Sequence, residues 1–264
     1  MSTRSVFISG AAAGIGRRTA LSFAERGWTV GAYDIDEAGL VSLAEEVRPL
    51  AGSLVTGRLD VTDADAFAAA VSAFAGEAGD RLDVLVNNAG VLLAGPFEDR
   101  AAADHHREID INVKGLVNGV HAGFPHLDRT PGSVVVNLAS ASAIYGQADL
   151  ANYSATKFFV RGLTEALDIE WKRHGIRVVA IWPLFVETAM TADIRTGTTD
   201  SLGIRLSPQD VADKILEAVE QPRVRRALHQ VHYPVGFQTS AMTLGARFSP
   251  AWLTRAVNKR LAGH

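Results

Sequence analysis

Residues 137–157 read NLASASAIYGQADLANYSATK and decide the fold. They begin at the polar end of an apolar run, residues 133–138, which is typical of a buried strand, and they end inside a helical pattern. The stretch therefore predicts a crossing from a strand into a helix. On that helix Tyr153 and Lys157 are four residues apart, so their side chains share one face, about 5–6 Å from each other.

This pairing has a chemical use. A free tyrosine keeps its proton up to about pH 10, and a neighbouring ammonium lowers the pKa of the phenol by favouring the phenolate. Ser140, at the end of the strand, could hold a carbonyl or alcohol oxygen against the phenol. Such a pair is also common on solvated helix faces, so this interpretation depends on a cofactor site elsewhere in the chain.

Composition sets the broad class. The chain has 264 residues, 47% hydrophobic and 21% charged, which is ordinary for an α/β protein that buries a sizeable core. The absence of cysteine excludes disulfides, thiolate catalysis and cysteine-ligated metals. No apolar run reaches the length of a signal peptide or a membrane span, so we expect a cytoplasmic enzyme.

A glycine motif opens the chain. The apolar run 5–9 leads directly into Gly10, Ala13, Gly14, Ile15 and Gly16, and a helical pattern covers 17–26. Strand, glycine turn and helix form the context in which the backbone approaches a pyrophosphate at the positive end of a helix. The alternative is a plain glycine-rich turn.

The next predicted strand, 28–33, ends at Asp34. A carboxylate there can accept hydrogen bonds from an adenosine ribose and would repel a 2′-phosphate, which favours NAD over NADP. Arg17 and Arg18 weaken this preference, whereas Ala13 and Ile35, which flank the site, are not basic.

Helical patterns at 37–47 and 64–74 alternate with strand patterns at 54–59 and 84–86, which predicts parallel strands with right-handed crossovers. Asp60 and Val61 follow the third strand. Asp60 could accept from an adenine amino group, form a helix-capping Asp-x-Thr turn, or do both. Asn87 and Asn88 could satisfy backbone groups where strands diverge, with Gly90 leaving room for a cofactor.

Taken together, these motifs resemble the short-chain dehydrogenase/reductase family over residues 5 to about 220. The resemblance rests on the order and separation of Gly10, Gly14, Gly16, the run Asn87-Asn88-Ala89-Gly90, Asn112, Ser140, Tyr153 and Lys157. It implies one Rossmann-type domain over residues 1–264, with three α/β/α layers and a mostly or wholly parallel sheet of about seven strands. It also implies a nicotinamide cofactor.

The resemblance gives each member of the Asn-Ser-Tyr-Lys tetrad a role. Tyr153 would be the general acid/base, Ser140 would hold the substrate oxygen, and Lys157 would lower the Tyr153 pKa and bind the nicotinamide ribose. Asn112 would bend its helix slightly and hold a water linking Lys157 to solvent. Ser142 is a possible substitute for Ser140, but its side chain would face the other way if the strand continued.

The residues expected to contact the cofactor are Gly10, Ala13, Gly14, Ile15, Gly16, Asp34, Asp60, Val61, Asn88, Ala89, Gly90, Tyr153, Lys157, Pro183, Val186 and Thr188. Val186 and Thr188 would hold the carboxamide. Leu184 follows Pro183 where the family usually has glycine, which adds bulk near the nicotinamide and requires an ordinary backbone conformation.

By the same resemblance, residues 188–206 would cover the substrate. The predicted pocket is apolar, which suggests a hydrophobic secondary alcohol or ketone, such as a steroid, terpenoid or lipid-derived compound. The alternative is that these residues are core packing. They are Met190, Ile194, Leu202, Ile204 and Leu206, with Leu92, Leu93, Ile144, Leu184 and Phe185.

At the C-terminal end, Ser207 and Pro208 predict the start of a helix to about Glu220, and 227–233 predicts the last strand. Residues 236–264 form a basic amphipathic extension. No acidic residue follows Glu220, where seven basic residues occur, whereas the preceding part has 19 basic and 29 acidic residues. The extension could form a subunit interface, cover the substrate pocket, contact an anionic membrane or hold an anionic substrate.

The leading hypothesis is an NAD-dependent alcohol dehydrogenase or ketone reductase. The alternatives are a nicotinamide-sensing protein without turnover, a reductase of a small polar carbonyl, and a sugar-nucleotide epimerase or dehydratase, whose usual glycine spacing differs. The resemblance implies a homodimer or homotetramer through the helices that bear Asn112 and Tyr153. We expect no nucleic-acid partner, and no metal site, since His105, His106, His229 and His232 lack ligand spacing.

Overall fold

The computed structural model describes residues 3–191, 203–221 and 230–262. They contain one sheet in the order β3-β2-β1-β4-β5-β6-β7, in which every neighbouring pair is parallel. This confirms the predicted Rossmann-type fold and its seven parallel strands. The strands are β1 Ser5–Ser9, β2 Thr29–Asp34, β3 Ser53–Arg58, β4 Val84–Asn87, β5 Val134–Leu138, β6 Arg177–Trp182 and β7 His232–Pro234.

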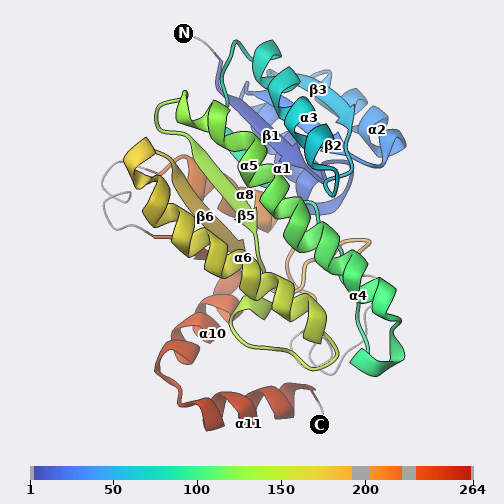
Figure 1. Ribbon diagram of the computed structural model, residues 1–264, viewed down its shortest axis with the longest axis vertical. Helices are drawn as coiled ribbons and strands as arrows, with labels where there is room; N and C mark the ends of the chain where they lie inside the picture. The colour runs from blue at the N-terminus through green and yellow to red at the C-terminus, as the bar shows by residue number, and fades with distance from the viewer. Residues whose placement is uncertain (1–2, 192–202, 222–229, 263–264) are drawn as a thin grey trace.

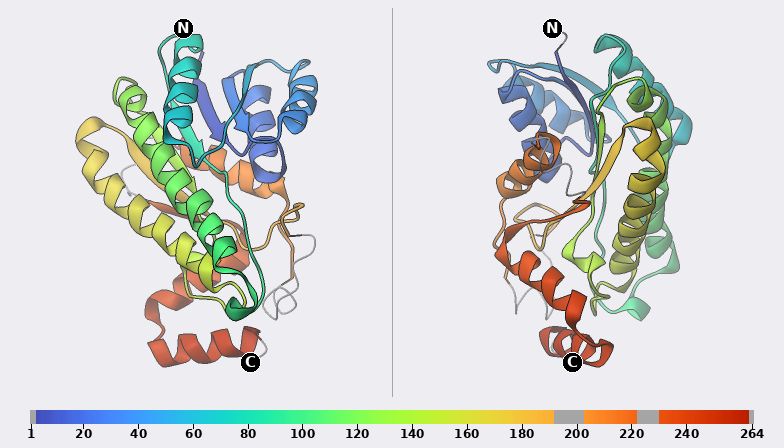
Figure 2. Two further views of the ribbon diagram at one scale, coloured as in Figure 1. Left: turned by 45° about the vertical axis from the view of Figure 1, so that its right-hand side comes forward. Right: turned by 90° about the vertical axis from the view of Figure 1, so that its left-hand side faces the viewer.

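Helices cover both faces of the sheet (Figures 1 and 2). One face carries α1 and α2, with α8 packed against α1, and the other carries α3, α5 and α6. The helices are α1 Gly14–Glu25, α2 Glu37–Val47, α3 Ala64–Glu77, α4 Ala102–Ile109, α5 Gly115–Asp128, α6 Ala151–Glu170, α8 Pro208–Val219, α10 Gly236–Phe248 and α11 Ala251–Ala262. Shorter turns are the 3-10 helices η1 Phe97–Asp99, η3 Ala141–Ala143 and η4 Trp171–His174, and the π-helix η2 Asp110–Lys114.

The central strands β1, β4, β5 and β6 are mostly apolar because both of their faces are buried, whereas the edge strand β3 is partly exposed. In β1, Val6 and Ile8 belong to the core under α1 and α2, whereas Phe7 belongs to the core under α3. Phe7 stacks on Tyr33 at 4.5 Å between ring centroids. The alternation of side chains along each strand therefore supplies both cores.

The strand order reverses between β1 and β4, and the carboxyl ends of these strands open a crevice at that point. Ser9 at the end of β1 is in register with Asn87 at the end of β4, and Asn87 is in register with Asn137 of β5. The glycine turn and the stretch 137–157 therefore meet at one edge of the sheet.

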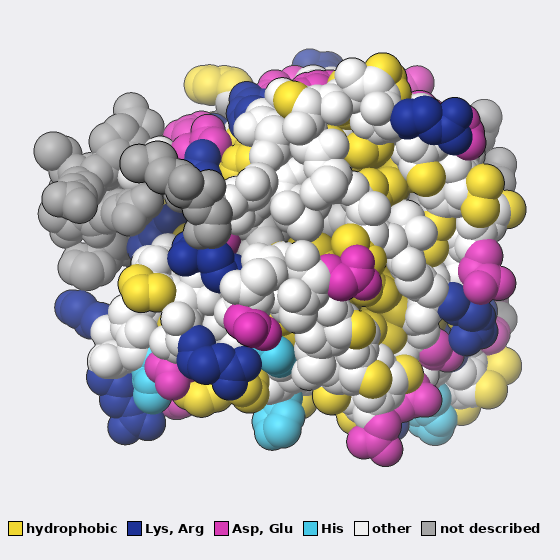
Figure 3. All heavy atoms as spheres, turned by 90° about the horizontal axis from the view of Figure 1, so that it is seen from above, with side chains coloured by type: hydrophobic (Ala, Val, Ile, Leu, Met, Phe, Trp, Pro, Cys, Tyr) yellow, Lys and Arg dark blue, Asp and Glu magenta, His cyan; other side chains and the backbone are white. Residues whose placement is uncertain are grey.

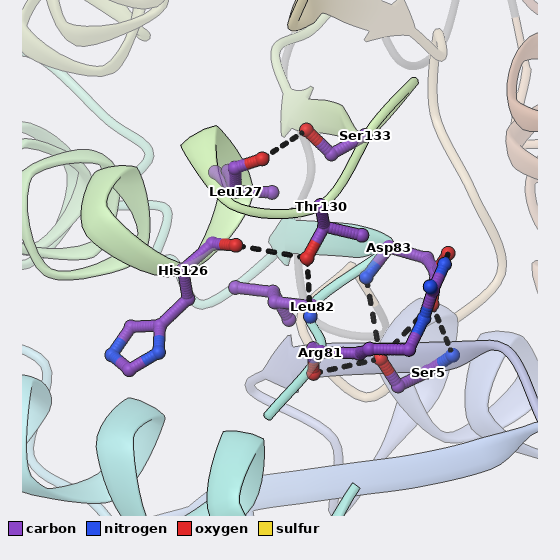
Figure 4. Close-up of polar contacts among 8 residues, drawn as sticks. All are labelled: Ser5, Arg81, Leu82, Asp83, His126, Leu127, Thr130 and Ser133. Carbon is purple, nitrogen blue, oxygen red and sulfur yellow. Dashed lines mark hydrogen bonds and ion pairs between the residues drawn. The ribbon is translucent and has the colours of Figure 1, made fainter. Parts of the chain in front are cut away.

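The opposite, amino-terminal edge is fixed by polar contacts that join separate elements (Figure 4). The Ser5 hydroxyl donates to the Arg81 carbonyl at 3.0 Å, and the Leu82 N–H donates to the Thr130 hydroxyl at 3.1 Å. These hydrogen bonds fix the end of the sheet that lies away from the crevice. Figure 3 shows that acidic and basic side chains are mixed over one end of the molecule.

The C-terminal third differs in detail from the prediction. Ser207 caps α8 through a capping box with Asp210, as its sequence indicates. The last strand is β7, His232–Pro234, and residues 227–229 of the predicted strand lie outside the described residues. The extension folds as the helices α10 and α11. In the described ranges, no helix is long and apolar enough to span a membrane.

Candidate active site

The turn after β1 requires glycine for two different reasons. Gly10 and Gly14 have φ angles of +69° and +54°, in the left-handed region that glycine adopts without strain. Gly16 has an ordinary φ, but a Cβ there would lie 2.0 Å from the Gly10 carbonyl oxygen. Gly16 therefore lets α1 pack under the turn.

A cavity of about 590 Å³ opens above this turn. Every residue predicted to contact the cofactor lines it except Gly16. Ser140, Ser142 and Leu184 line the same cavity as Tyr153 and Lys157. The cavity thus joins the glycine turn, Asp34 and the stretch 137–157 in one space.

Carboxylates mark the far end of this cavity. Asp34 accepts hydrogen bonds from the Ala12 N–H at 2.9 Å and from the Asp36 N–H at 3.0 Å. Asp60 accepts from both the Thr62 N–H and the Thr62 hydroxyl, and these bonds lower the pKa of Asp60. The predicted Asp-x-Thr turn is present, but Asp63 caps α3, so the helix-capping role is wrong for Asp60.

The two arginines that weakened the NAD prediction are engaged elsewhere. Arg17 pairs with Glu46 at 2.6 Å and donates to the Ala12 and Gly39 carbonyls. Arg18 pairs with Glu25 at 2.8 Å. Neither guanidinium lines the cavity.

Asn88 holds the crevice together. Its Nδ2 donates to the carbonyls of Ser9 at 3.1 Å and Gly10 at 2.8 Å, which are the backbone groups that lose a strand partner where β1 and β4 diverge. Asn87 instead donates to the Asn137 side chain at 3.0 Å. A Cβ at Gly90 would come within 3.1 Å of Asn112 Oδ1, so glycine avoids a close contact with Asn112 at this wall of the cavity.

Tyr153 and Lys157 lie on one face of α6, as their spacing predicts, with Lys157 Nζ 5.4 Å from the centre of the Tyr153 ring. Lys157 is buried and donates to the Leu138 carbonyl at 2.8 Å. This bond directs the ammonium to the end of β5. Ser140 follows β5 and is the N-cap of η3, with its hydroxyl accepting from the Ser142 N–H at 3.1 Å.

Asn112 sits in the π-helix η2, which is the departure from α geometry that its predicted role requires. Its amide accepts from the Val91 N–H and donates to the Val91 carbonyl, both at 2.8 Å. Behind it, a small cavity of about 10 Å³ is bordered by Asn112, Lys157 and Asn87. Within the described residues Asn87 Oδ1 has no hydrogen-bond partner, so this space suits a single water.

Comparison with known proteins agrees with this arrangement. A family model described as short chain dehydrogenase matches residues 4–199. The chain belongs to the short-chain dehydrogenase family.

Two relatives and one solved structure illustrate the similarity. The 3-oxoacyl-(acyl-carrier-protein) reductase FabG of Thermotoga maritima is 35% identical over 79% of this chain and 87% of that protein. The trans-4-hydroxycyclohexanecarboxylate dehydrogenase of Sinomonas cyclohexanicum is 36% identical over 79% of this chain and 83% of that protein. A short chain dehydrogenase from Mycobacterium paratuberculosis bound to NAD is 27% identical, with a TM-score of 0.80 over 88% of this chain and 96% of that one.

The electrostatics of this short-chain dehydrogenase differ from the prediction. Burial raises the pKa of Tyr153 to about 12, while a hydrogen bond with Ser140 lowers it and Glu108 raises it further. Burial therefore outweighs the effects that favour the phenolate, and the Tyr153 pKa of the protein without its cofactor is raised. Burial lowers the pKa of Lys157 to about 8, against the opposing effect of Glu108.

Ser142 is also placed differently. The strand ends at Leu138 and η3 follows, so Ser142 does not face away from Ser140. The Ser140 hydroxyl donates to the Ser142 hydroxyl at 3.2 Å, which in turn donates to Gln147 Oε1 at 3.0 Å. A row of three polar side chains therefore supports the position where a substrate oxygen would bind.

The segment after β6 forms the remaining wall. Pro183 accepts a hydrogen bond from the Ala141 N–H at 2.8 Å, and Leu184 has no positive φ, as expected for its side chain. Val186 pairs with Leu206, which brings the two ends of the predicted cover together. The middle of that segment, 192–202 with Ile194 and Leu202, lies outside the described residues.

Of the residues predicted to make the substrate pocket apolar, four line the cavity: Leu92, Leu184, Phe185 and Met190. Leu93, Ile144, Ile204 and Leu206 do not line it. Leu206 and Ile144 instead pack against the core clusters. For these two residues the alternative, core packing, is correct.

Sequence reasoning missed several residues near the site. Arg107, Asp110 and Ile111 line the cavity. Glu108 is fully buried beside them and bonds to Asn152, which precedes Tyr153. No periodic or motif signal distinguishes Glu108 from a solvated acidic residue, because its burial depends on α4 packing against α6.

The histidines have structural partners. His105 stacks on Phe97 at 4.2 Å between ring centres, and His232 pairs with Glu165 at 2.7 Å. No group of residues suited to a metal ion occurs within the described ranges, and His229 lies outside them.

Proposed function

We propose that this short-chain dehydrogenase interconverts a secondary alcohol and a ketone with NAD as cofactor, and that Tyr153 is the general acid/base. The observation that carries this proposal is the single cavity in which the glycine turn and Asp34 meet Ser140, Tyr153 and Lys157. The Mycobacterium paratuberculosis relative is bound to NAD, which supports a nicotinamide cofactor for this chain.

Bound NAD would accept the hydride from the alcohol carbon, and the reduced form would return it. The chain's residues provide binding and proton transfer. The Ser140 hydroxyl orients the substrate oxygen toward Tyr153. The Tyr153 phenolate takes the hydroxyl proton during oxidation, and the phenol returns it during reduction. Lys157, fixed by the Leu138 carbonyl, supplies a buried positive charge that favours the phenolate in the transition state.

Two features support NAD over NADP. Asp34 lies at the cavity wall with both carboxylate oxygens directed to backbone N–H groups of the turn region. A 2′-phosphate placed there would meet like charge. The nearby Arg17 and Arg18 are held by Glu46 and Glu25, so they do not offset that repulsion.

The substrate side of the cavity supports an apolar alcohol or ketone, such as a steroid, terpenoid or lipid-derived compound. Leu92, Leu184, Phe185 and Met190 line it, and the only hydroxyls that the described residues place next to the nicotinamide end are Ser140, Ser142, Tyr153, Thr188 and Thr191. A largely apolar wall favours substrates that lose little hydration on binding.

The relatives named above keep a second substrate class open. One is named for a 3-oxoacyl group on acyl-carrier protein, and the other for hydroxycyclohexanecarboxylate, which carries an anionic carboxylate. Arg107 at the cavity wall could bind such a group. Reduction of a small polar carbonyl is therefore the second candidate function.

A sensing protein without turnover is the weaker alternative. It would need the cofactor-binding end of the cavity but not Ser140, Tyr153 and Lys157 around one point.

We further propose that the enzyme is cytoplasmic. We also propose that it forms a homodimer or homotetramer through α5 and α6, because Val117, Phe158 and Phe159 on these helices are exposed.

The test is a panel of initial rates with NAD and NADP on apolar secondary alcohols, steroids, polyols and hydroxy acids. We expect turnover of an apolar alcohol with NAD, and its loss by roughly 10²–10⁴-fold in Tyr153→Phe. Retained NADH binding in that variant separates loss of chemistry from loss of folding. Turnover that is indifferent to Tyr153→Phe would refute the proposed role, and faster turnover of polyols would refute the apolar substrate.

A further inference from the structure

Helix α10 presents an unusual outer face. Phe237 is 87% exposed and Phe248 is 80% exposed, and Leu244 between them is exposed as well. Together with exposed Ala241 they follow the spacing of one helical face. The other side of the helix packs on β7 and η3, with Thr239 fully buried. The aromatic residues therefore lie on the solvent side of a helix whose other side is anchored.

Helix α11 adds positive charge to an aromatic side chain. Trp252 is 70% exposed, and Arg255, Lys259 and Arg260 are exposed on neighbouring turns. Asn258, which is half-buried, donates to the Gly146 carbonyl and ties α11 to the body. In the views of Figures 1 and 2, α11 is the outermost element at its end of the molecule.

We define the C-terminal surface as the exposed residues Phe237, Ala241, Leu244, Phe248, Trp252, Arg255, Lys259 and Arg260. The chain from 221 to 264 contains no acidic residue, whereas the preceding part is strongly acidic. A partner for this surface must therefore carry negative charge and also offer an apolar region that can accept the exposed Phe and Trp rings.

We propose that the C-terminal surface binds an anionic phospholipid bilayer. Lipid phosphates satisfy the basic side chains, and the interfacial region accepts the aromatic rings without removing the charges from water. A two-fold contact between copies is a poorer match, because it would set Arg255, Lys259 and Arg260 against the same basic surface with no acidic residue of the extension to offset them.

The C-terminal surface lies close to the part of the fold that carries the active site. Helix α10 packs on η3, which follows Ser140 at the carboxyl end of β5. The C-terminal surface therefore lies at the end of the molecule where the cavity opens, although no described residue of α10 or α11 lines that cavity. One consequence rests on the proposed apolar substrate: membrane binding would place the enzyme next to the lipid phase in which that substrate dissolves. The binding itself does not depend on the substrate.

The experiment is sedimentation of the full chain with phosphatidylcholine vesicles, prepared with or without phosphatidylglycerol. We expect binding to the anionic vesicles and little to the neutral ones, with the bound fraction falling as salt screens the charges. Since each basic residue near such a surface contributes roughly five-fold in affinity, Arg255→Glu/Lys259→Glu should weaken binding by more than about ten-fold. Phe237→Ser/Phe248→Ser should also weaken it by about ten-fold or more.

Matched variants elsewhere provide the controls. Val41→Ser removes an apolar side chain that is 66% exposed on α2, and Lys172→Glu/Arg173→Glu reverses two exposed charges on η4. Both should bind vesicles within about two-fold of the wild type, since neither belongs to the C-terminal surface. Far-UV circular dichroism confirms that each variant is folded.

Two results would overturn the proposal. One is a wild-type chain that does not sediment with anionic vesicles at low salt. The other is binding that the α10 and α11 variants change no more than their controls do. If Phe237→Ser/Phe248→Ser instead lowers the mass measured by light scattering while vesicles have no effect, the surface is a subunit contact and the bilayer proposal is wrong.

Discussion

Asn152 donates a hydrogen bond from Nδ2 to Glu108 Oε2 at 2.6 Å, which joins α4 to α6 one residue before Tyr153. The other carboxylate oxygen of Glu108 accepts from the Leu93 N–H at 2.9 Å. Glu108 is fully buried, and although burial raises its pKa, these two donors favour the ionised form. Its charge in turn raises the pKa of both Tyr153 and Lys157.

Glu108→Gln should therefore shift the pH profile of alcohol oxidation. The substitution keeps the size of the side chain and removes the negative charge, so the phenolate of Tyr153 forms at lower pH than in the wild type. The rising limb of log(kcat/KM) against pH should move toward acid. Initial rates across the pH range with the best alcohol substrate measure this shift.

Asp104→Asn is the matched control, because Asp104 lies one turn earlier on α4 and is exposed. It should leave the pH profile in place. Glu108→Gln should also lose about 1–3 kcal/mol of stability, since its amide cannot accept from both donors. Lower stability with an unmoved pH profile would show that Glu108 has a structural role only.

Ser140→Ala and Ser142→Ala should separate the two hydroxyls at the end of β5. Removing Ser140 takes away the hydroxyl nearest Tyr153, and we expect kcat to fall by about 10²-fold. Ser142 acts through Ser140 and Gln147, so its loss should reduce kcat by less than about 10-fold. Steady-state kinetics of both variants decide this, and equal losses would make Ser142 a second direct contact to the substrate.

Asp34→Asn should weaken the preference for NAD. The change removes the charge that would repel a 2′-phosphate, so the ratio of kcat/KM for NAD to that for NADP should fall by about 10-fold or more. Asp36→Asn is the control, because Asp36 caps α2 through the Gly39 N–H and does not line the cavity. An unchanged ratio in Asp34→Asn would place the discrimination elsewhere in the adenosine site.

Much of this fold could be predicted because it depends on local pattern. Glycine positions mark the turn after β1, short apolar runs mark the strands, and the four-residue spacing places Tyr153 and Lys157 on one face. The orientation of Ser142 could not be predicted, because it depends on the residue at which β5 ends. Burial of Glu108 and the high pKa of Tyr153 depend on which helices pack together, which no local pattern records.

Gly16→Ala and Gly162→Ala should change stability in opposite directions. A Cβ at Gly16 would lie 2.0 Å from the Gly10 carbonyl oxygen, whereas one at Gly162 in α6 would meet nothing within 4 Å. We expect Gly16→Ala to lower the free energy of unfolding by about 1–3 kcal/mol and Gly162→Ala to raise it by about 0.5–1 kcal/mol. Urea unfolding measures both, and a neutral Gly16→Ala would mean that α1 can shift without loss of packing.

Lys157→Met should remove a pH dependence of stability. The pKa of Lys157 falls from 10.5 to about 8 on folding because the ammonium is buried. Between these values the unfolded chain binds more protons than the folded one, so this lysine makes the wild-type free energy of unfolding rise with pH, by up to about 1.4 kcal/mol per pH unit. Below pH ~8 lysine is protonated in both states and adds no slope.

The methionine variant should lack that rise, while loss of the bond to the Leu138 carbonyl lowers its stability by an amount that does not depend on pH. Tyr153 does not interfere, because its raised pKa affects stability only above about pH 10. Urea unfolding of wild type, Lys157→Met and the exposed control Lys172→Met at several pH values between about 7 and 10 isolates the difference. Parallel curves for wild type and Lys157→Met would show that the buried ammonium keeps its ordinary pKa, and the charge that we assign to Lys157 near neutral pH would then persist throughout the alkaline range.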